Sequence, residues 1–516
     1  MNLPITPRDY QTSIFNTAKN SNTLVVLPTG LGKTLIAIML AIERKKLYPL
    51  SRVLFLAPTR PLVEQHFQTF KSILPELFAQ LEIFTGSVPA EKRKKIFQSA
   101  EIIFSTPQCI ANDLDNYLYD LKEVSLLIID EAHRCLKNYD YTKVVKKYKE
   151  QSVNQRILGL TASPGHEPDK VKEICKHLDI QEIEVRTRDS EDVKQYLKER
   201  EFQKIEVPFP KEFHEIRILL KRIFDSRVDQ LKSRNILQGP ANKITLLKLQ
   251  ARLGFQISQR NWQAMHGLSL CAQAIKVSHA LELLETQTLL SLNEYLNKLL
   301  QDARESKSKA VKTLVSLPEF NAARVSLQQL LARKIEHPKL TRLTELVESE
   351  FSNNQNSKII IFANYRETGA LISRILNEKE KIKASVFVGQ AKKSSLSGLT
   401  SGQNQKEQKA IIEKFRSGEI NTLIATSIGE EGLDIPEVSA VIFYEPIPSA
   451  IRKIQRAGRT ARLSPGKLII LVTSGTRDEI HHYASHAREK KMHRTIESVK
   501  QDLKNKAKNP TLDTFK

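Results

Sequence analysis

Continuous apolar runs recur along the first 200 residues and alternate with longer stretches of helical periodicity. The runs occupy residues 23–27, 52–57, 81–85, 101–105, 125–130 and 156–161. Unbroken apolar runs indicate strands that are buried on both faces, as in a parallel sheet covered by helices. The same rhythm returns at residues 358–363, 384–389, 421–426, 440–445 and 467–473. The pattern therefore predicts an α/β protein with two parallel-sheet domains.

The segment between these two halves has a different pattern. "FHEIRILLKRIFDSRVDQLKSR" and "ALELLETQTLLSLNEYLNKLLQDAR" repeat apolar residues every three or four positions and contain no glycine or proline. This periodicity predicts an all-helical inserted domain. We therefore expect a first α/β domain at 1–200, a helical insertion at 201–340 and a second α/β domain at 341–495. The charged stretch from Ala487 onward is expected to be a helix that frays into a disordered basic C-terminal tail at 496–516.

The net charge of the chain is the feature of its composition that says most about its binding partner. The 516 residues include 80 Lys and Arg against 58 Asp and Glu, a formal charge of +22, and the insertion alone has 22 basic and 13 acidic residues. So basic a globular protein usually binds a polyanion, which points to nucleic acid. The insertion is either part of that contact surface or a solvated helical spacer. Composition does not distinguish DNA from RNA.

Other features of the sequence bear on the compartment. No run reaches the roughly 20 apolar residues of a membrane span, and the N-terminus lacks the pattern of a secretory signal. The four cysteines are scattered without a C-x-x-C pair, which argues against a zinc site or a disulfide framework. We expect an intracellular protein, in the cytoplasm of a prokaryote or associated with its nucleoid, that binds no membrane.

The segment "LPTGLGKT" (27–34) joins a predicted strand to a helical run. It matches the phosphate-binding pattern G-x-x-x-x-G-K-[ST], except that Leu27 replaces the first glycine. Gly30 and Gly32 allow the backbone to wrap closely around phosphates. Lys33 can reach the β- and γ-phosphates, and the Thr34 hydroxyl can ligate Mg²⁺. The motif alone leaves nucleotide binding open.

A second motif, "LLIIDEAH", ends the run at 125–130 with Asp130 and Glu131. P-loop proteins place a carboxylate at the end of a strand to hold Mg²⁺, so Asp130 is a candidate metal ligand. Glu131 can orient and deprotonate an attacking water. The two motifs together predict a site that binds nucleotide phosphates with Mg²⁺ and activates a water.

"LPTGLGKT" and "DEAH" resemble motifs I and II of the superfamily-2 helicases, in which motif I often lacks the first glycine. Seven further segments resemble the other motifs of this superfamily in the expected order: "APTRPLVEQ" (57–65), "TGS" (85–87), "STPQ" (105–108), "LTASP" (160–164), "IIIFANYRETG" (359–369), "ATSIGEEGLDIP" (425–436) and "QRAGRTAR" (455–462). The resemblance covers both α/β domains. It implies two RecA-like motor domains with ATP and Mg²⁺ in the cleft between them.

The resemblance implies a role for each matching residue. Nucleotide contacts would come from Arg8, Gln11, Pro28, Thr29, Gly30, Leu31, Gly32, Lys33, Thr34, Gly432 and Asp434. The catalytic set would be Lys33, Asp130, Glu131, Gln455, Arg459 and Arg462, with the two arginines acting as fingers on the γ-phosphate. Thr34 and Asp130 would bind the metal, while Gln455 and His133 would couple the domains. The sugar-phosphate backbone would be contacted, without reading base sequence, by Arg60, Thr85, Gly86, Thr106 and Thr426.

Within the superfamily, the chain is similar to the Hef/Fanconi-anaemia M branch of DNA translocases. "PRDYQ", "LGLTASPG", "FVGQAKK" and the helical insertion carry this resemblance, and the insertion stands where that branch has a thumb-like domain believed to grip branched duplexes. Archaeal Hef continues into an XPF-type nuclease with an E-R-K signature that this sequence lacks, so we expect no nuclease activity. The resemblance implies an ATP-dependent DNA helicase or translocase that acts on forks and Holliday junctions in repair and replication-fork processing.

Two other functions stay open at this point. The motor and an inserted helical domain also occur in RNA-directed ATPases of the RIG-I/Dicer-like group, and the same motifs serve an ATP-gated clamp that binds nucleic acid without strand separation. The C-terminal "NPTLDTFK" raises one possible partner. Leu512 and Phe515 have the L-x-x-F spacing of sliding-clamp-binding tails, although Asn509 replaces the usual glutamine and Lys516 replaces the second aromatic residue.

Overall fold

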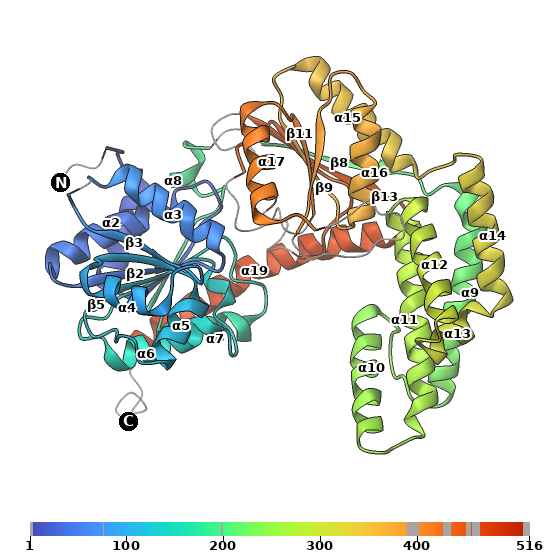
Figure 1. Cartoon of the computed structure of the whole chain (residues 1–516), viewed down its shortest axis with the longest axis horizontal. Coiled ribbons are helices and arrows are strands. Elements are labelled where there is room, and N and C mark those ends of the chain that lie inside the picture. The colour runs from blue at the N-terminus through green and yellow to red at the C-terminus, as the bar shows by residue number, and fades with distance from the viewer. Residues whose placement is uncertain are drawn as a thin grey trace.

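The computed structural model describes residues 4–75, 77–197, 200–389, 402–426, 435–449, 456 and 465–508. These residues form two α/β domains and a helical insertion that projects from the second domain (Figure 1). No helix among them combines the length and the apolar character that crossing a bilayer requires.

The first domain is built on seven parallel strands in the order β3-β4-β2-β5-β6-β1-β7. Their bounds are β1 (Thr23–Val26), β2 (Arg52–Leu56), β3 (Leu81–Phe84), β4 (Ile102–Ser105), β5 (Val124–Ile129), β6 (Ile157–Thr161) and β7 (Glu182–Val185). The helices around the sheet are α1 (Asp9–Asn20), α2 (Lys33–Leu47), α3 (Arg60–Ile73), α4 (Ala90–Ser99), α5 (Pro107–Asp115), α6 (Asp140–Gln151), α7 (Pro168–His177) and α8 (Glu191–Lys194), with a 3-10 turn η1 (Ala132–Arg134). Because the strands are parallel, the loops after them meet at one edge of the sheet.

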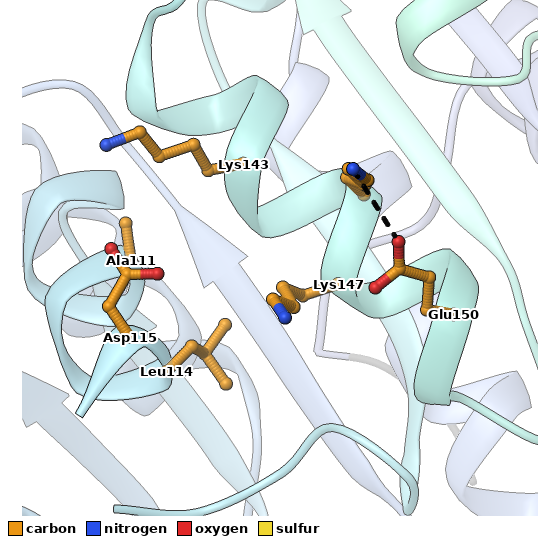
Figure 2. Close-up of a pocket in the computed structure, with 7 residues that line it drawn as sticks. Ala111, Leu114, Asp115, Lys143, Lys147 and Glu150 are labelled. Atoms are coloured by element: carbon orange, nitrogen blue, oxygen red, sulfur yellow. Dashed lines mark ion pairs between the residues drawn. The ribbon is translucent and has the colours of Figure 1, made fainter. Parts of the chain in front are cut away.

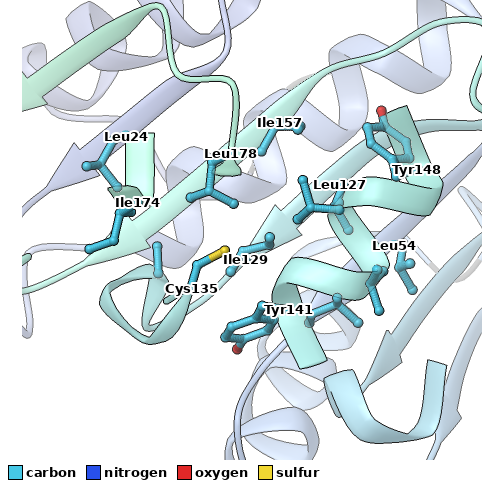
Figure 3. Packing of buried hydrophobic residues seen from close by; sticks show 14 of the residues in the cluster. Leu24, Leu54, Leu127, Ile129, Cys135, Tyr141, Tyr148, Ile157, Ile174 and Leu178 are labelled. Atoms are coloured by element: carbon cyan, nitrogen blue, oxygen red, sulfur yellow. The ribbon is translucent and has the colours of Figure 1, made fainter. Parts of the chain in front are cut away.

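Both faces of this sheet are covered, which explains the unbroken apolar runs. Leu127 and Ile129 of β5 pack with Tyr141 and Tyr148 of α6 on one face (Figure 3). The alternate residue Ile128 belongs to the cluster on the other face, where α1, α2 and α3 lie. Successive strand residues point to opposite faces, so a strand buried on both sides needs apolar side chains throughout.

The second domain has six parallel strands in the order β10-β11-β9-β12-β13-β8. Their bounds are β8 (Arg200–Val207), β9 (Ile359–Phe362), β10 (Ala384–Phe387), β11 (Thr422–Ala425), β12 (Ala440–Phe443) and β13 (Gly466–Thr473), and the helices are α15 (Pro338–Asn353), α16 (Arg366–Asn377) and α17 (Gln405–Ser417). Strand β8 lies in the segment expected to be all-helical, yet it pairs with β13 along its whole length. Among residues 201–207 of this edge strand only Val207 is buried, so the strand shows no continuous apolar run.

The insertion consists of the turn η2 (Lys211–Phe213) and the helices α9 (His214–Ser233), α10 (Lys243–Ser258), α11 (Ala264–Thr286), α12 (Leu289–Arg304), α13 (Lys309–Val315) and α14 (Pro318–Ala332). A buried polar cluster joins it to the second domain. Lys339 of α15 pairs with Asp478, both fully buried, and its Nζ also donates to the Thr286 carbonyl at 3.3 Å. Thr368 donates to the Gln287 side chain at 2.8 Å. A buried charge is costly unless paired, so this cluster defines how the insertion is oriented.

Helix α19 (Arg477–Lys508) connects the two α/β domains. It begins beside β13, and its later part lies along the first domain (Figure 1). Met492, Ile496 and Val499 are buried in the core cluster of the first domain. The tail expected from residue 496 is therefore helical as far as Lys508, and residues 509–516 lie outside the described residues.

Candidate functional site

The phosphate-binding segment 27–34, here called the P-loop, lies between β1 and α2 at the carboxyl edge of the first sheet. Gly30 and Gly32 have φ angles of 84° and 77°, in the left-handed region that glycine adopts without strain. A Cβ on Gly32 would also lie 2.2 Å from the Gln11 side-chain nitrogen. The left-handed φ is the main reason for glycine at position 32, since the end of the Gln11 side chain could shift. The backbone of Gly32 leads directly into the N-terminus of α2, where phosphates are favoured.

Two side chains of α1 form hydrogen bonds with the backbone of the P-loop. Tyr10 donates its hydroxyl hydrogen to the Leu31 carbonyl at 2.8 Å, and the Gln11 side chain donates to the same carbonyl at 3.1 Å. The Gln11 oxygen accepts from the Arg8 amide at 2.9 Å. The structure thus brings Arg8, Gln11 and Leu31 together, and their contact with a nucleotide stays a prediction.

Lys33 and Asp130 lie close enough to interact electrostatically. The Lys33 ammonium donates to the Leu27 carbonyl at 2.9 Å. Asp130 follows β5 and is buried, which alone would raise the pKa of its carboxyl. The charge and hydrogen bond of His66 and the charge of Lys33 outweigh that burial, and the pKa lies below its ordinary value. Asp130 is therefore an anion beside the P-loop.

Glu131 has a strained backbone. Its φ of 49° and ψ of 47° place a non-glycine residue in the left-handed region, at a cost of about 1–2 kcal/mol. The next residues fold into η1, whose Arg134 amide donates to the Glu131 carbonyl at 2.9 Å. Strain of this kind persists where surrounding contacts impose it, often at functional sites. In this conformation the Glu131 carboxylate lies next to His133, and its Oε2 is 3.2 Å from Nδ1 of the imidazole.

His133 connects the site to "LTASP". Its Nδ1 lies 3.1 Å from the Thr161 hydroxyl, which in turn donates to the Ser163 carbonyl at 3.1 Å. The Ser163 hydroxyl donates to the sulfur of Met492 on α19 at 2.7 Å. A chain of contacts thus runs from Glu131 to the helix shared by both domains. The contribution of Met492 was not predicted from the sequence.

The predicted nucleic-acid contacts lie after neighbouring strands. Thr85 and Thr106 follow β3 and β4, which pair side by side, and Gly86 is exposed next to them. Thr426 follows β11 of the second sheet and, like Thr85, is largely buried. Arg60, at the start of α3, pairs with Glu64 at 2.8 Å, and Glu64 also pairs with Lys409 of α17 at 2.6 Å. Arg60 therefore belongs to a charged contact between the two α/β domains.

Several predicted site residues lie outside the described residues: Gly432, Asp434, Gln455, Arg459, Arg462, Leu512 and Phe515. Their roles stay predictions. Within "QRAGRTAR", Arg456 is described. It is fully buried, and its guanidinium lies over the Phe362 ring at 4.7 Å and donates to the Asn364 side chain at 3.3 Å.

The donor set near the P-loop suits Mg²⁺. Thr34 supplies a hydroxyl and Asp130 a carboxylate, which are the hard oxygen ligands that Mg²⁺ prefers. Among the described residues, no group of three His, Cys, Asp or Glu side chains is arranged to enclose a metal. Mg²⁺ commonly binds through one or two protein oxygens together with substrate phosphates. The buried Thr29 hydroxyl, which has no hydrogen-bond partner, leaves a further polar atom for such a ligand.

A pocket of about 240 Å³ lies between α5 and α6 (Figure 2). Lys143, Lys147 and Glu150 line it from α6, and Ala111, Leu114 and Asp115 from α5. None of the predicted site residues takes part, so the pocket is separate from the candidate nucleotide site.

Three family models match consecutive parts of the chain. The DEAD/DEAH box helicase model matches residues 8–171, a helical-bundle model described for ATP-dependent RNA helicases matches 212–337, and the helicase conserved C-terminal domain matches 338–464. These segments correspond to the first α/β domain, the insertion and the second α/β domain.

Known proteins are similar over nearly the whole chain. The crystal structure of the Pyrococcus furiosus Hef helicase domain is 41% identical, with a TM-score of 0.70 over 93% of this chain and 98% of that one. A Methanocaldococcus jannaschii protein named as an ATP-dependent RNA helicase is 38% identical over 95% of this chain. The ATP-dependent DNA helicase mph1 of Neurospora crassa is 35% identical over 92% of it. This chain spans 61% and 41%, respectively, of the lengths of these two relatives.

Proposed function

Because the chain belongs to the Hef family of DEAD/DEAH box helicases, we propose that it is an ATP-driven helicase or translocase that acts on branched DNA. The observation that carries the proposal is the edge of the first sheet, where Lys33, Asp130, Glu131 and His133 follow β1 and β5. This arrangement provides a phosphate cradle, a metal ligand and a general base within one site.

The residues of the site would act in sequence on ATP. Lys33 would exchange the Leu27 carbonyl for the β- and γ-phosphates, and Glu131 would take a proton from the attacking water. Thr34 and Asp130 would hold Mg²⁺, which when bound supplies positive charge against the phosphates. Arginine fingers from the second domain, Arg459 and Arg462 by resemblance, would complete the set only when the domains approach each other.

Contacts between the domains support the conversion of ATP turnover into motion. The hydrogen bonds from His133 through Thr161 and Ser163 reach Met492 of α19, which begins on the second domain. A change in the position of Glu131 would therefore be transmitted through these contacts to α19, which both domains contact. Such a linkage suits a motor that steps along a strand as its cleft opens and closes.

The end of the insertion farthest from the second domain supports a nucleic-acid substrate (Figure 1). No aspartate or glutamate occurs between Asp229 and Glu282, whereas seven lysines and arginines do. Phe255 and Trp262 are 65% and 64% exposed there. We call the exposed side chains of Arg234, Arg252, Phe255, Arg260, Trp262 and Met265 the tip surface. Exposed aromatic rings in a segment rich in positive charge suit unpaired bases and phosphates, as a branch point presents.

The test compares nucleic acids at equal concentrations, each expressed as the concentration of nucleotide residues in the polymer. ATPase stimulation and strand displacement are measured with forked DNA, a four-way junction, linear duplex DNA and duplex RNA. We expect branched DNA to stimulate hydrolysis most and its arms to be displaced. Equal stimulation by linear duplex would refute a branched substrate. Stimulation without any displacement or movement would favour an ATP-gated clamp.

A variant of the tip surface makes the test specific. Trp262→Ala should raise the Kd for forked DNA about tenfold, the effect of losing one stacked base. Binding to linear duplex and basal ATPase should stay unchanged, because the ring lies far from the ATP site. Val325→Ala, which removes another exposed apolar side chain of the insertion, is the matched control. An unchanged Kd for forked DNA with Trp262→Ala would remove the tip surface from substrate binding.

An RNA substrate is the second candidate. The name of the Methanocaldococcus jannaschii relative and the description of the helical-bundle model both mention RNA. The backbone contacts expected from Thr85, Thr106 and Thr426 are compatible with either polymer. Stronger ATPase stimulation by duplex RNA than by any DNA in the same panel would favour this candidate.

Docking of a sliding clamp on Leu512 and Phe515 is a separate proposal that rests on their spacing alone. A peptide of residues 500–516 should bind the clamp of the same organism in calorimetry with a Kd of about 1 μM, roughly −8 kcal/mol. Replacing both residues with alanine should abolish that heat. Equal binding by the alanine peptide would refute the proposal.

A further inference from the structure

One buried histidine contacts both candidate metal ligands. His66 lies on α3 and is 8% exposed. Its Nε2 lies 2.8 Å from Oδ2 of Asp130, and its Nδ1 lies 3.4 Å from the hydroxyl of Thr34. Neither the P-loop motif nor "DEAH" includes this residue, which directly follows "APTRPLVEQ".

The hydrogen-bonding capacity of each group determines how the three are arranged. A carboxylate only accepts, so Nε2 of His66 donates its hydrogen to Asp130. Nδ1 accepts the hydrogen of the Thr34 hydroxyl when the ring is neutral and donates its own hydrogen to the Thr34 oxygen when the ring is charged, so it contacts this hydroxyl in either state. This contact fixes the position of the Thr34 oxygen and leaves it at least one free lone pair, and His66 contacts Asp130 through Oδ2 and not through Oδ1. Both ligands are held with oxygen lone pairs available to a cation.

The ring itself is held in place by packing. His66 lies against Phe55 of β2, with ring centroids 4.4 Å apart. Val63, one turn earlier on α3, is fully buried and belongs to the same core. An apolar side chain would fill this position equally well, so a purely structural role gives no reason for a histidine. Its two polar contacts are what an apolar residue would lose.

We propose that His66 is a positioning residue that prepares Thr34 and Asp130 to bind Mg²⁺ together with nucleotide. This inference rests on the proposed ATP site but does not depend on the nature of the nucleic acid. Groups that orient metal ligands commonly change metal affinity by 10- to 100-fold when they are removed.

The experiment measures nucleotide binding by the full chain without DNA. The affinity for fluorescent mant-ADP is determined in Mg²⁺ and in EDTA, and the ratio of the two affinities reports the metal. His66→Leu keeps the volume but removes both hydrogen bonds. We expect the ratio to fall about tenfold, with the affinity in EDTA within twofold of wild type.

Two further variants separate positioning from packing. His66→Gln retains one donor and one acceptor on a side chain of similar reach, and it should restore most of the ratio. Val63→Ala disturbs the same core without touching the ligands. It should lower the melting temperature and leave the ratio unchanged. A normal ratio in His66→Leu, or an equal fall in Val63→Ala, would overturn the proposal.

A shorter amide covers the case in which the leucine variant does not fold. His66→Asn keeps a polar group that is too short to reach both ligands, so it should show the reduced ratio, and a wild-type ratio would overturn the proposal. If wild-type protein binds mant-ADP equally with and without Mg²⁺, the proposed ATP site itself fails. If branched DNA does not stimulate the ATPase but the affinity ratios are as expected, His66 remains the positioning residue. Only the proposed DNA substrate is then refuted.

Discussion

Helix α19 should detach from the first domain when its buried side chains are shortened. Met492 and Ile496 are 2% and 1% exposed and belong to the core of that domain. Truncation of a buried Met or Ile to Ala costs 2–5 kcal/mol, and the lower figure applies where a helix can move away. The ion pair of Lys172 with Asp502 at 2.8 Å is half exposed and contributes little. The double alanine variant should therefore weaken docking by about 4 kcal/mol, roughly 1,000-fold.

Amide hydrogen exchange measures this change directly. The amides of residues 493–505 should lose protection by up to about 1,000-fold in the double variant. Ile480→Ala is the matched control, because Ile480 lies near the start of the same helix and is 66% exposed. DNA-stimulated ATPase should fall in the double variant, whereas mant-ADP binding should stay normal. Unchanged protection of residues 493–505 would show that other contacts hold the helix and would refute the reasoning.

The remaining predictions concern turnover and pH. Glu131→Gln should lower ATP turnover by at least about 100-fold and leave ATP affinity within twofold, and near-normal turnover would exclude Glu131 as the base. Arg459→Ala should cost about 1,000-fold in turnover, and a rate within a few-fold of wild type would contradict a cleft completed by both domains. Burial raises the pKa of Glu445 from 4.5 to about 7. The contribution of Glu445 to the free energy of unfolding is therefore fully present below pH 4.5. It is lost as the pH rises through 7, by up to about 3 kcal/mol. Glu445→Gln should flatten this decline, and equal declines in melting temperature between about pH 5 and pH 8 would refute it.

The two sheets were predicted from the sequence because their inner strands are buried on both faces. All eleven apolar runs correspond to strands, and the two-sheet architecture with a helical insertion is confirmed. The two missed strands, β7 and β8, are edge strands. Phe202 of β8 is 46% exposed, whereas Val207 is buried. An edge strand is partly exposed and carries fewer apolar residues than an inner strand, so its sequence resembles a loop or the start of a helix.

The docking of α19 had a visible signal. Met492, Ile496, Val499 and Leu503 recur at intervals of three and four residues within an otherwise charged segment. That spacing is one apolar stripe of a helix and needs a surface to cover it. The high charge of the segment indicated a solvated tail instead. The stripe packs on a domain more than 300 residues away in the sequence, and periodicity alone cannot identify such a partner.

His66 shows why a site is only partly readable from its sequence. Lys33, Thr34, Asp130 and Glu131 are recognisable because each would contact ATP, Mg²⁺ or water, whose chemistry dictates the residue type. His66 contacts only Thr34 and Asp130, so its identity depends on how α3 packs beside β5 and the P-loop. A lone histidine on the buried face of a helix is ordinarily a core residue. Residues that position others are thus found from distances in the folded chain. Their substitution should lower the affinity for the ligand while the fold stays intact.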